Sequence, residues 1–259
     1  MKKSVYILLC SVVIFCVLFG CSQKGAEKNI QAEISGSDTL KEEVLYASTP
    51  DETGARASQI PNFSSERTLC AFSMPHNAGK SLQLISVGRY SGAYVEDGTD
   101  DSVSDVAAVV IQNTGDKFIK SANITLVGKN NKEYSFSLTS LPAGCSVLLL
   151  ETNRAVFIAE ESITVATVGT VEEQPIPQLC EDKVSVDFAD GKLILKNLTD
   201  KDFRAVYIRY KNYTAGNVYM GGVTYSASFS NVTTSGEYVC ESAHFTEGFS
   251  QIMMVQIVE

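Results

Sequence analysis

Tryptophan is absent from this chain of 259 residues, and histidine occurs only twice, as His76 and His244. Histidine is the side chain that most often transfers protons in enzymes near neutral pH, so the supply of catalytic groups is small. No spacing in the sequence marks a nucleophilic triad or a pair of carboxylates placed for acid–base chemistry. We therefore expect a protein that is not an enzyme and that needs no cofactor.

Positive charge is also scarce. The formal net charge is −9 at pH 7, and the isoelectric point is near 4.9. Nucleic acids and anionic lipid surfaces attract proteins through basic patches, which this composition does not favour, so we expect no nucleic-acid partner. Hydrophobic residues make up 44% of the chain, which is enough to bury a core and excludes a protein that is disordered throughout.

The amino terminus carries a long apolar run, Val5–Gly20, after the basic residues Lys2 and Lys3. The run is shorter than the roughly 20 residues that a spanning helix needs, and its layout is typical of a secretory signal. Leu18-Phe19-Gly20-Cys21 resembles the lipobox of bacterial lipoproteins. The resemblance implies a signal peptide at 1–20, cleavage before Cys21, and a lipid on the Cys21 sulfur that anchors the protein to the outside of the cell membrane. The alternative is an uncleaved anchor with an incidental cysteine.

Residues 21–66 are polar, rich in Gly, Ser, Glu, Lys and Gln, and almost free of apolar periodicity. This composition is typical of flexible linkers, so we expect a disordered tether. The apolar triplet Val44-Leu45-Tyr46 interrupts it without an assigned role.

Sustained helical periodicity is missing from the rest of the chain. Short stretches rich in β-branched residues, such as Asp105–Gln112, alternate with turns such as Leu141-Pro142-Ala143-Gly144. Period-two alternation predicts that Lys120, Ala122, Ile124 and Leu126 share one face of one strand, and that Tyr134, Phe136 and Leu138 share one face of the next. These features predict an all-β fold of the β-sandwich class.

One motif occurs twice. Asn113-Thr-Gly-Asp-Lys is followed by an alternating strand, and so is Asn197-Leu-Thr-Asp-Lys, 84 residues later. Apolar residues recur at the same offset: Leu193 and Leu195 match Val109 and Ile111, and Val206, Ile208 and Tyr210 match Ala122, Ile124 and Leu126. Gly236 matches Gly144 if the second copy carries an insertion before it.

The two copies are separated by a segment with two prolines and two glutamates. We therefore predict two tandem β-sandwich domains, at 67–169 and 180–259, joined by a linker at 170–179. In the second copy, alternation from Tyr219 to Phe229 predicts one long half-buried strand with a bulge at Gly221-Gly222. Ile252–Val258 is expected to be a terminal strand.

Asp105–Leu150 combines a strand, the Asn-x-x-Asp-Lys turn, a second strand and the Leu-Pro-Ala-Gly corner. In this order it resembles the FxLYD-like family of bacterial immunoglobulin-like domains. The resemblance implies a small immunoglobulin-like sandwich on an extracellular or envelope protein. The family has no shared catalytic activity, so the resemblance implies none here.

Three sets of residues are candidate sites. Tyr207, Arg209 and Tyr213 belong to a group of aromatic and basic side chains that could form an exposed face for glycans or peptides, or could pack across the sheet. Tyr207 and Arg209 are out of phase with Val206 and Ile208 and are expected to point outward.

The second set is a run of carboxylates, Asp97, Asp100, Asp101 and Asp105. Several oxygen ligands within one loop suit calcium, but the spacing is not that of an EF-hand, and a solvated acidic loop is the alternative. The third set is Cys70, Cys145, Cys180 and Cys240. One disulfide in each domain, Cys70–Cys145 and Cys180–Cys240, suits an oxidising compartment, and buried free thiols are the alternative.

Together these features predict a lipoprotein that acts as a non-catalytic binding or spacing module at the bacterial cell surface. Its expected partners are the membrane, through the lipid, and an envelope protein or glycan. The alternative is an enzyme or an accessory subunit of one, with a site at the domain interface.

Overall fold

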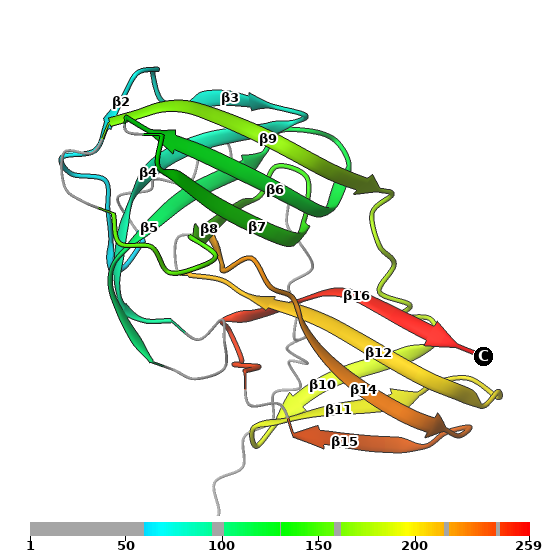
Figure 1. The fold of residues 1–259 in the computed structure, drawn as a ribbon. Helices are drawn as coiled ribbons and strands as arrows, with labels where there is room; N and C mark the ends of the chain where they lie inside the picture. The colour runs from blue at the N-terminus through cyan, green and yellow to red at the C-terminus, as the bar shows by residue number, and fades with distance from the viewer. Residues whose placement is uncertain (1–59, 95–100, 130, 158–161, 215–217, 242–243) are drawn as a thin grey trace, which may run out of the picture. The chain divides into compact units, whose positions relative to one another are not determined.

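The computed structural model describes residues 60–94, 101–129, 131–157, 162–214, 218–241 and 244–259 (Figure 1). Every regular element among them is a β-strand, so the prediction of an all-β fold is confirmed. All of these residues belong to one compact unit, and none of them forms a helix able to cross a membrane. The predicted signal peptide and Cys21 lie outside the described residues.

The first half of the chain forms two sheets, one of which also includes the short strand β13 from the second half. Sheet A has the strand order β1-β4-β5-β8-β13, with β3 also paired to β4. Its strands are β1 (Phe63–Ser64), β3 (His76–Gly79), β4 (Leu82–Ala93), β5 (Ser102–Asn113), β8 (Ser146–Leu150) and β13 (Val218–Met220). Sheet B has the order β2-β9-β6-β7. Its strands are β2 (Leu69–Cys70), β9 (Ser162–Gln174), β6 (Phe118–Gly128) and β7 (Glu133–Leu141).

The second half also forms two sheets. Sheet C has the order β10-β11-β15, and sheet D has the order β14-β12-β16. The strands of sheet C are β10 (Val184–Ala189), β11 (Lys192–Asn197) and β15 (Glu237–Glu241). Those of sheet D are β12 (Phe203–Asn212), β14 (Tyr225–Val232) and β16 (Ser250–Val258). The β10–β11 hairpin turns at Asp190-Gly191, both with positive φ, as its short loop requires.

Strand pairing repeats between the halves. The antiparallel pairs β4–β5, β5–β8, β6–β7 and β6–β9 correspond to β10–β11, β11–β15, β12–β14 and β12–β16. The register of the β5–β8 pair recurs in the β11–β15 pair. Ile111 of β5 lies opposite Val147 of β8, and Leu195, which has the position of Ile111 in the second copy, lies opposite Tyr238 of β15. The repeat in the sequence is therefore a repeat of structure.

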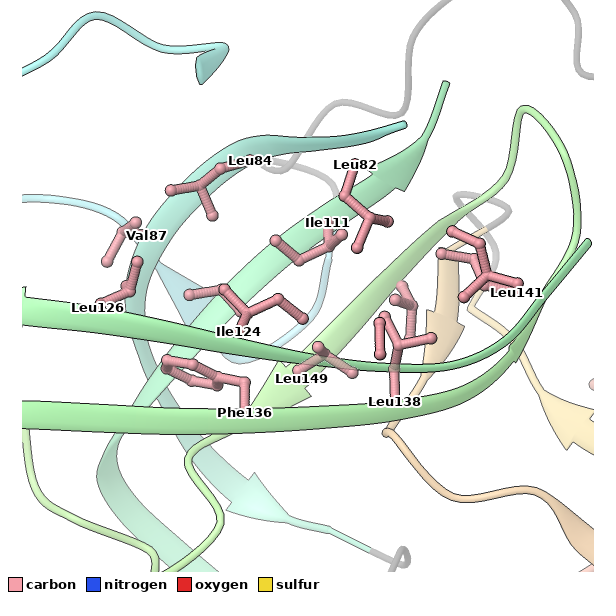
Figure 2. Packing of buried hydrophobic residues seen from close by; sticks show 14 of the residues in the cluster. Leu82, Leu84, Val87, Ile111, Ile124, Leu126, Phe136, Leu138, Leu141 and Leu149 are labelled. Atoms are coloured by element: carbon pink, nitrogen blue, oxygen red, sulfur yellow. The ribbon is translucent and has the colours of Figure 1, made fainter. Parts of the chain in front are cut away.

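Each half has its own apolar core. Figure 2 shows side chains of β4, β5 and β8, such as Leu84, Ile111 and Leu149, facing those of β6 and β7. Tyr134, Phe136 and Leu138 share one face of β7, as predicted, and this face is buried, with the three residues at 0–2% exposure. The matched residues of the second half, Leu193, Leu195, Val206, Ile208 and Tyr210, are buried between sheets C and D.

The prediction that Lys120 shares a face of β6 with Ala122, Ile124 and Leu126 is wrong. Ala122, Ile124 and Leu126 are buried, but Lys120 is exposed. The pairing of β6 with β9 shifts register between Ile119 and Ser121, which reverses the alternation at this end of the strand. Lys120 instead forms an exposed ion pair with Glu172 at 3.1 Å, and its charge lowers the pKa of that carboxyl.

The two repeated asparagines organise equivalent turns. The amide nitrogen of Asn113 donates to the carbonyls of Lys117 and Leu141 at 2.9 and 3.1 Å, and its side-chain oxygen accepts from the Gly115 N–H at 3.0 Å. Asn197 makes the same three bonds, to the carbonyls of Lys201 and Thr233 and from the Thr199 N–H, at 2.8, 3.1 and 2.9 Å. Both asparagines are buried, at 0% and 1% exposure.

The inserted residues of the second copy form a connection between the two halves. The loop between β6 and β7 covers 129–132, whereas the corresponding connection between β12 and β14 covers 213–224 and contains β13. The predicted long strand from Tyr219 to Phe229 is therefore wrong. It breaks at Gly221-Gly222, so that β13 pairs in parallel with β8 of sheet A while β14 joins sheet D.

Contacts from this insertion fix it to the first half. Gly221 N–H donates to the Leu148 carbonyl at 2.8 Å, and Thr139 N–H donates to the Gly222 carbonyl at 2.7 Å. Lys211, at 1% exposure, donates from Nζ to the carbonyls of Thr139 and Val223 at 3.1 and 2.5 Å. A buried lysine thus bonds to both halves of the chain.

Two segment boundaries differ from those predicted. β9 continues to Gln174, five residues into the segment 170–179 that we predicted as a linker, because 171–174 still pair with β6. Residues 60–66 are not part of a free tether, since Ile60 is buried and β1 pairs with β4. The polar composition of residues 21–66 does not indicate that the chain joins sheet A before residue 67.

Gly88 allows β1 to approach sheet A. A Cβ at this position would lie 2.1 Å from the Ser64 carbonyl oxygen, which is a backbone atom that cannot simply move aside. We expect Gly88→Ala to displace β1 and to lower the free energy of unfolding by roughly 2 kcal/mol. Gly169→Ala is the matched control, because its Cβ would meet nothing closer than 3.6 Å. Equal denaturation midpoints for the two variants would contradict the close approach of β1.

Candidate binding face

The outer face of sheet D presents one aromatic and one cationic side chain. Tyr207 and Arg209 lie on the central strand β12 and are exposed, Tyr207 at 37%, as their phase against the buried Val206 and Ile208 predicted. Neither side chain has a hydrogen-bond or ion-pair partner within the described ranges. Both are therefore available to a ligand.

Polar side chains, together with Met254 of β16, lie beside this pair on the two neighbouring strands, which flank β12 in Figure 1. Tyr207 lies opposite Ser228 of β14 and Gln256 of β16, and Arg209 lies opposite Ser226 and Met254. Ser226, Ser228 and Ser230 are all exposed. Alternation of serine at positions 226, 228 and 230 with apolar residues is the signal in the sequence for this outer row.

The first half lacks this chemistry. Asn123 and Thr125 stand on β6 at the positions of Tyr207 and Arg209, opposite Ser137 and Ser135. The matched face of sheet B thus carries small polar side chains, without the phenol or the guanidinium. Tyr207 and Arg209 are features of the second copy alone, which separates a possible ligand role from the shared framework of the repeat.

Tyr213 is not part of this face. Its backbone N–H donates to the Phe249 carbonyl at 2.9 Å, it forms an isolated bridge with Tyr219, and its side chain packs against the first core. Our prediction that Tyr213 lies with Tyr207 and Arg209 is wrong, because β12 ends at Asn212 and the chain turns toward β13.

The predicted acidic site falls partly outside the described residues, which exclude Asp97 and Asp100. Asp105 forms an ion pair with Arg89 at 3.3 Å, and one of its carboxylate oxygens accepts from the Ser104 hydroxyl. No group of three or more His, Cys, Asp or Glu side chains in the described part of the chain is placed to hold a metal ion. The ion pair with Arg89 partly neutralises the Asp105 carboxylate, whose negative charge would otherwise favour a bound cation.

The four cysteines beyond Cys21 are free thiols in the structure. Cys180 Sγ donates to the Val255 carbonyl at 3.6 Å, and Cys240 Sγ to the Glu241 carbonyl at 3.4 Å, while both pack against the second core. Burial raises the pKa of Cys70 and Cys145, so both are neutral thiols, which are weak nucleophiles. The pairing Cys180–Cys240 in an oxidising compartment stays a prediction.

Tyr219 of β13 is buried in the first core at 4% exposure. Its hydroxyl donates to the Gln251 side chain and interacts with the Cys145 thiol. Burial, and then the neighbouring Cys145, raise the pKa of Tyr219. An unfolded tyrosine ionises near pH ~10, so the stabilising contribution of Tyr219 is complete below that pH and is lost as the pH rises further.

We therefore expect the free energy of unfolding to fall above pH ~10, with Tyr219 contributing up to about 1.4 kcal/mol per pH unit. Tyr219→Phe should be less stable at neutral pH, because it loses the bond to Gln251, but should lose less stability at alkaline pH. Urea unfolding from pH 8 to 11 measures both effects. Tyr207→Phe, at an exposed position, is the control, and parallel pH curves for wild type and Tyr219→Phe would contradict the assignment.

Both histidines pack on aromatic rings. His76 of β3 stacks on Phe72 with ring centroids 4.2 Å apart, and His244 stacks on Tyr225 at 4.8 Å. The Nδ1 atom of His244 is buried without a hydrogen-bond partner among the described residues. These contacts explain both histidines as packing residues.

Comparison with known proteins does not assign the chain to a family. No protein-family model matches the chain, and no curated protein matches it either.

Proposed function

We propose that this protein is a lipid-anchored module outside the cytoplasm, that it carries out no chemistry, and that the outer face of sheet D is its binding surface. The observation that carries the proposal is the exposed pair Tyr207 and Arg209, without side-chain partners among the described residues and without counterparts in the first copy. An aromatic ring and a guanidinium among hydroxyl and amide groups suit a glycan or a peptide of the envelope.

The anchor belongs to the same proposal. The lipobox-like Leu18-Phe19-Gly20-Cys21 predicts that the mature protein begins at a lipidated Cys21, which would hold the binding surface at the outside of the cell membrane. A two-chain lipid gives stable attachment where a single chain would be marginal. The tether and the sandwiches would then act together as a displayed binding or spacing module.

The alternative, an enzyme with a site between the two halves, finds less support. The polar residues at that joint include Cys145 and Tyr219, which are the kinds of side chain that can act as nucleophiles. Burial raises the pKa of both, and a nucleophile needs the opposite shift. Their contacts with Gln251 and the first core suit a structural role.

Membrane partition of the full-length protein and of Cys21→Ala tests the anchor. We expect the wild-type protein to enter the detergent phase with a mass raised by the lipid, and Cys21→Ala to leave that phase or to keep its signal peptide. Cys10→Ala and Cys16→Ala, inside the predicted signal peptide, are the controls and should behave as wild type. A wild-type protein of unmodified mass would rule out the lipid anchor.

A bait for binding experiments has to include the residues before β1. A soluble form that starts at residue 66 would lose Ile60 and β1, which belong to the folded part. We therefore choose the chain from residue 22 as bait for solubilised envelope. Retention of an envelope component by this bait supports the proposal, and failure to retain any component from a native envelope preparation counts against a binding role.

A further inference from the structure

Sheet D is the basic part of an acidic protein. Its three strands contain Arg204, Arg209 and Lys211 and no Asp or Glu, whereas the whole chain has a net charge of −9. Strands of sheets A, B and C all include acidic residues. Lys211 is buried at the joint between the halves, so the two arginines remain for the surface. An anion would meet the least repulsion at this sheet.

Both arginines are exposed and unpaired. Neither Arg204 nor Arg209 forms a hydrogen bond or an ion pair with another described residue. The acidic residues nearest to them in the chain do not neutralise them. Asp202 accepts from the Thr234 N–H at 2.7 Å, and Glu259 forms no ion pair with any described residue. The guanidinium groups are therefore open to an anion from outside the chain.

The first copy neutralises the matching cation within its own sheet. Lys120 has the position of Arg204 and forms an ion pair with Glu172 of β9 at 3.1 Å. The strand register places Val258 of β16 at the position of Glu172. The second copy thus keeps the cation and has an apolar residue in place of the acid that would pair with it.

The spacing of the two arginines suits a polymer. At roughly 3.3 Å per residue, Arg204 and Arg209 are separated by about 16 Å along β12. Side chains stand roughly perpendicular to a sheet, so one small anion would not bond to both guanidinium groups. Tyr207 lies between them, opposite Ser228 of β14 and Gln256 of β16. A chain with anionic groups at intervals could contact both arginines and cross the Tyr207 ring.

We propose that the outer face of sheet D binds an anionic glycan, a polymer of hydroxyl-bearing units with carboxylate or phosphate groups along its length. This proposal rests on the binding surface proposed above and names the class of its ligand. Arg204 and Arg209 bond to the anionic groups, and the Tyr207 ring packs against a unit between them. Ser228 and Gln256 supply hydrogen bonds to hydroxyl groups.

A peptide fits this face less well. Extended peptides bind to sheets by adding a strand to an edge, where backbone groups are free. The arginines and the tyrosine stand on β12, the central strand, whose backbone is already paired with β14 and β16. The ligand is therefore recognised by side chains alone, through charge, a ring and hydroxyl groups, which favours a glycan.

Calorimetric titration of the full-length protein in non-ionic detergent tests the class of ligand. The probes are polygalacturonate, poly(glycerol phosphate), and methyl-esterified polygalacturonate as the neutral match of the first. We expect binding of at least one anionic polymer at low salt, weaker binding at high salt because exposed charges are screened, and no binding of the ester. The anionic probe that binds distinguishes carboxylate from phosphate. Equal affinity for acid and ester, or binding of neither anionic polymer, would overturn the proposal.

Two charge-matched variants locate the site. Arg204→Gln/Arg209→Gln should weaken binding by roughly tenfold or more, because it removes charge-assisted hydrogen bonds. Lys192→Gln/Lys196→Gln removes the same charge from exposed positions of sheet C and should bind as wild type. Arg204→Lys/Arg209→Lys keeps the charge and should retain most of the affinity, and equal melting temperatures check that all variants fold. Equal affinities of the two glutamine variants would contradict the proposed site.

Two further outcomes separate the ligand class from the surface itself. Poly-L-glutamate that binds as tightly as the anionic glycans would assign the face to acidic peptides and overturn the glycan. A neutral envelope component retained by the bait from residue 22 would support the binding surface and overturn the anionic ligand. A bait that retains no component counts against the surface and the ligand together.

Discussion

Asn197→Ala is expected to lower the free energy of unfolding by about 2–4 kcal/mol, because it removes three hydrogen bonds that a buried side chain makes to the backbone of its turn. The Asn197 amide bonds to the carbonyls of Lys201 and Thr233 and to the Thr199 N–H, at 1% exposure. The same loss is expected for Asn113→Ala, since the turn of the first copy has equivalent bonds. Urea unfolding followed by circular dichroism measures both.

Asn123→Ala is the control for these two variants. Asn123 is an exposed residue of β6, so its replacement should change stability by no more than about 0.5 kcal/mol. Asn197→Asp tests the role of the amide nitrogen as a donor. In this variant a carboxylate oxygen, which cannot donate, would face the two carbonyls that accept from the Asn197 amide nitrogen. A cost for Asn197→Ala as small as that for Asn123→Ala would show that the repeated asparagine does not hold the turn.

Lys211→Ala should have an effect of similar size for a different reason. Lys211 Nζ is buried and donates to the carbonyls of Thr139 in β7 and Val223 in the insertion, so its removal deletes both hydrogen bonds and leaves a cavity at the joint. We expect a loss of roughly 3 kcal/mol, because the variant loses two hydrogen bonds from a buried donor and leaves a cavity. Lys211→Met keeps most of the side-chain volume, so it should recover only the part of the lost stability that is due to packing.

The unfolding curve provides a further readout. Because the Lys211 ammonium group bonds to both halves, its loss should make the halves unfold less cooperatively and should lower the slope of the denaturation curve. Lys196→Ala, an exposed lysine on β11, should leave both midpoint and slope unchanged. A Lys211→Ala protein with wild-type stability would contradict the role of this side chain in joining the halves.

The repeated framework could be predicted because its signals are local. Asn113 and Asn197 satisfy the backbone of their own turns, so the motif encodes the same geometry wherever it occurs. The alternation of Val206, Ile208 and Tyr210 fixed which side chains of β12 point inward, and thereby placed Tyr207 and Arg209 outside. Both inferences depend only on residues close together in the chain.

The connections between the halves could not be predicted in the same way. Period-two alternation continues from β13 into β14, and it does not reveal that the two strands belong to different sheets. A lysine within a strand is normally exposed, and the burial of Lys211 depends on Thr139, which is distant in sequence. The consecutive apolar residues Val106–Ile111 are a signal of a strand buried on both faces, of which only the strand itself was predicted.

The central claim is that the second copy carries a binding surface which the first copy lacks. The most direct measurement compares three baits, each starting at residue 22, for the amount of envelope component that they retain from the same solubilised membrane preparation. The variant Tyr207→Asn/Arg209→Thr receives the residues of the first copy at these positions, and Asn123→Ala/Thr125→Ala is the matched control on sheet B. We predict that the wild type and the control retain the component and that the Tyr207→Asn/Arg209→Thr variant loses it. Equal retention by all three folded baits would contradict the claim.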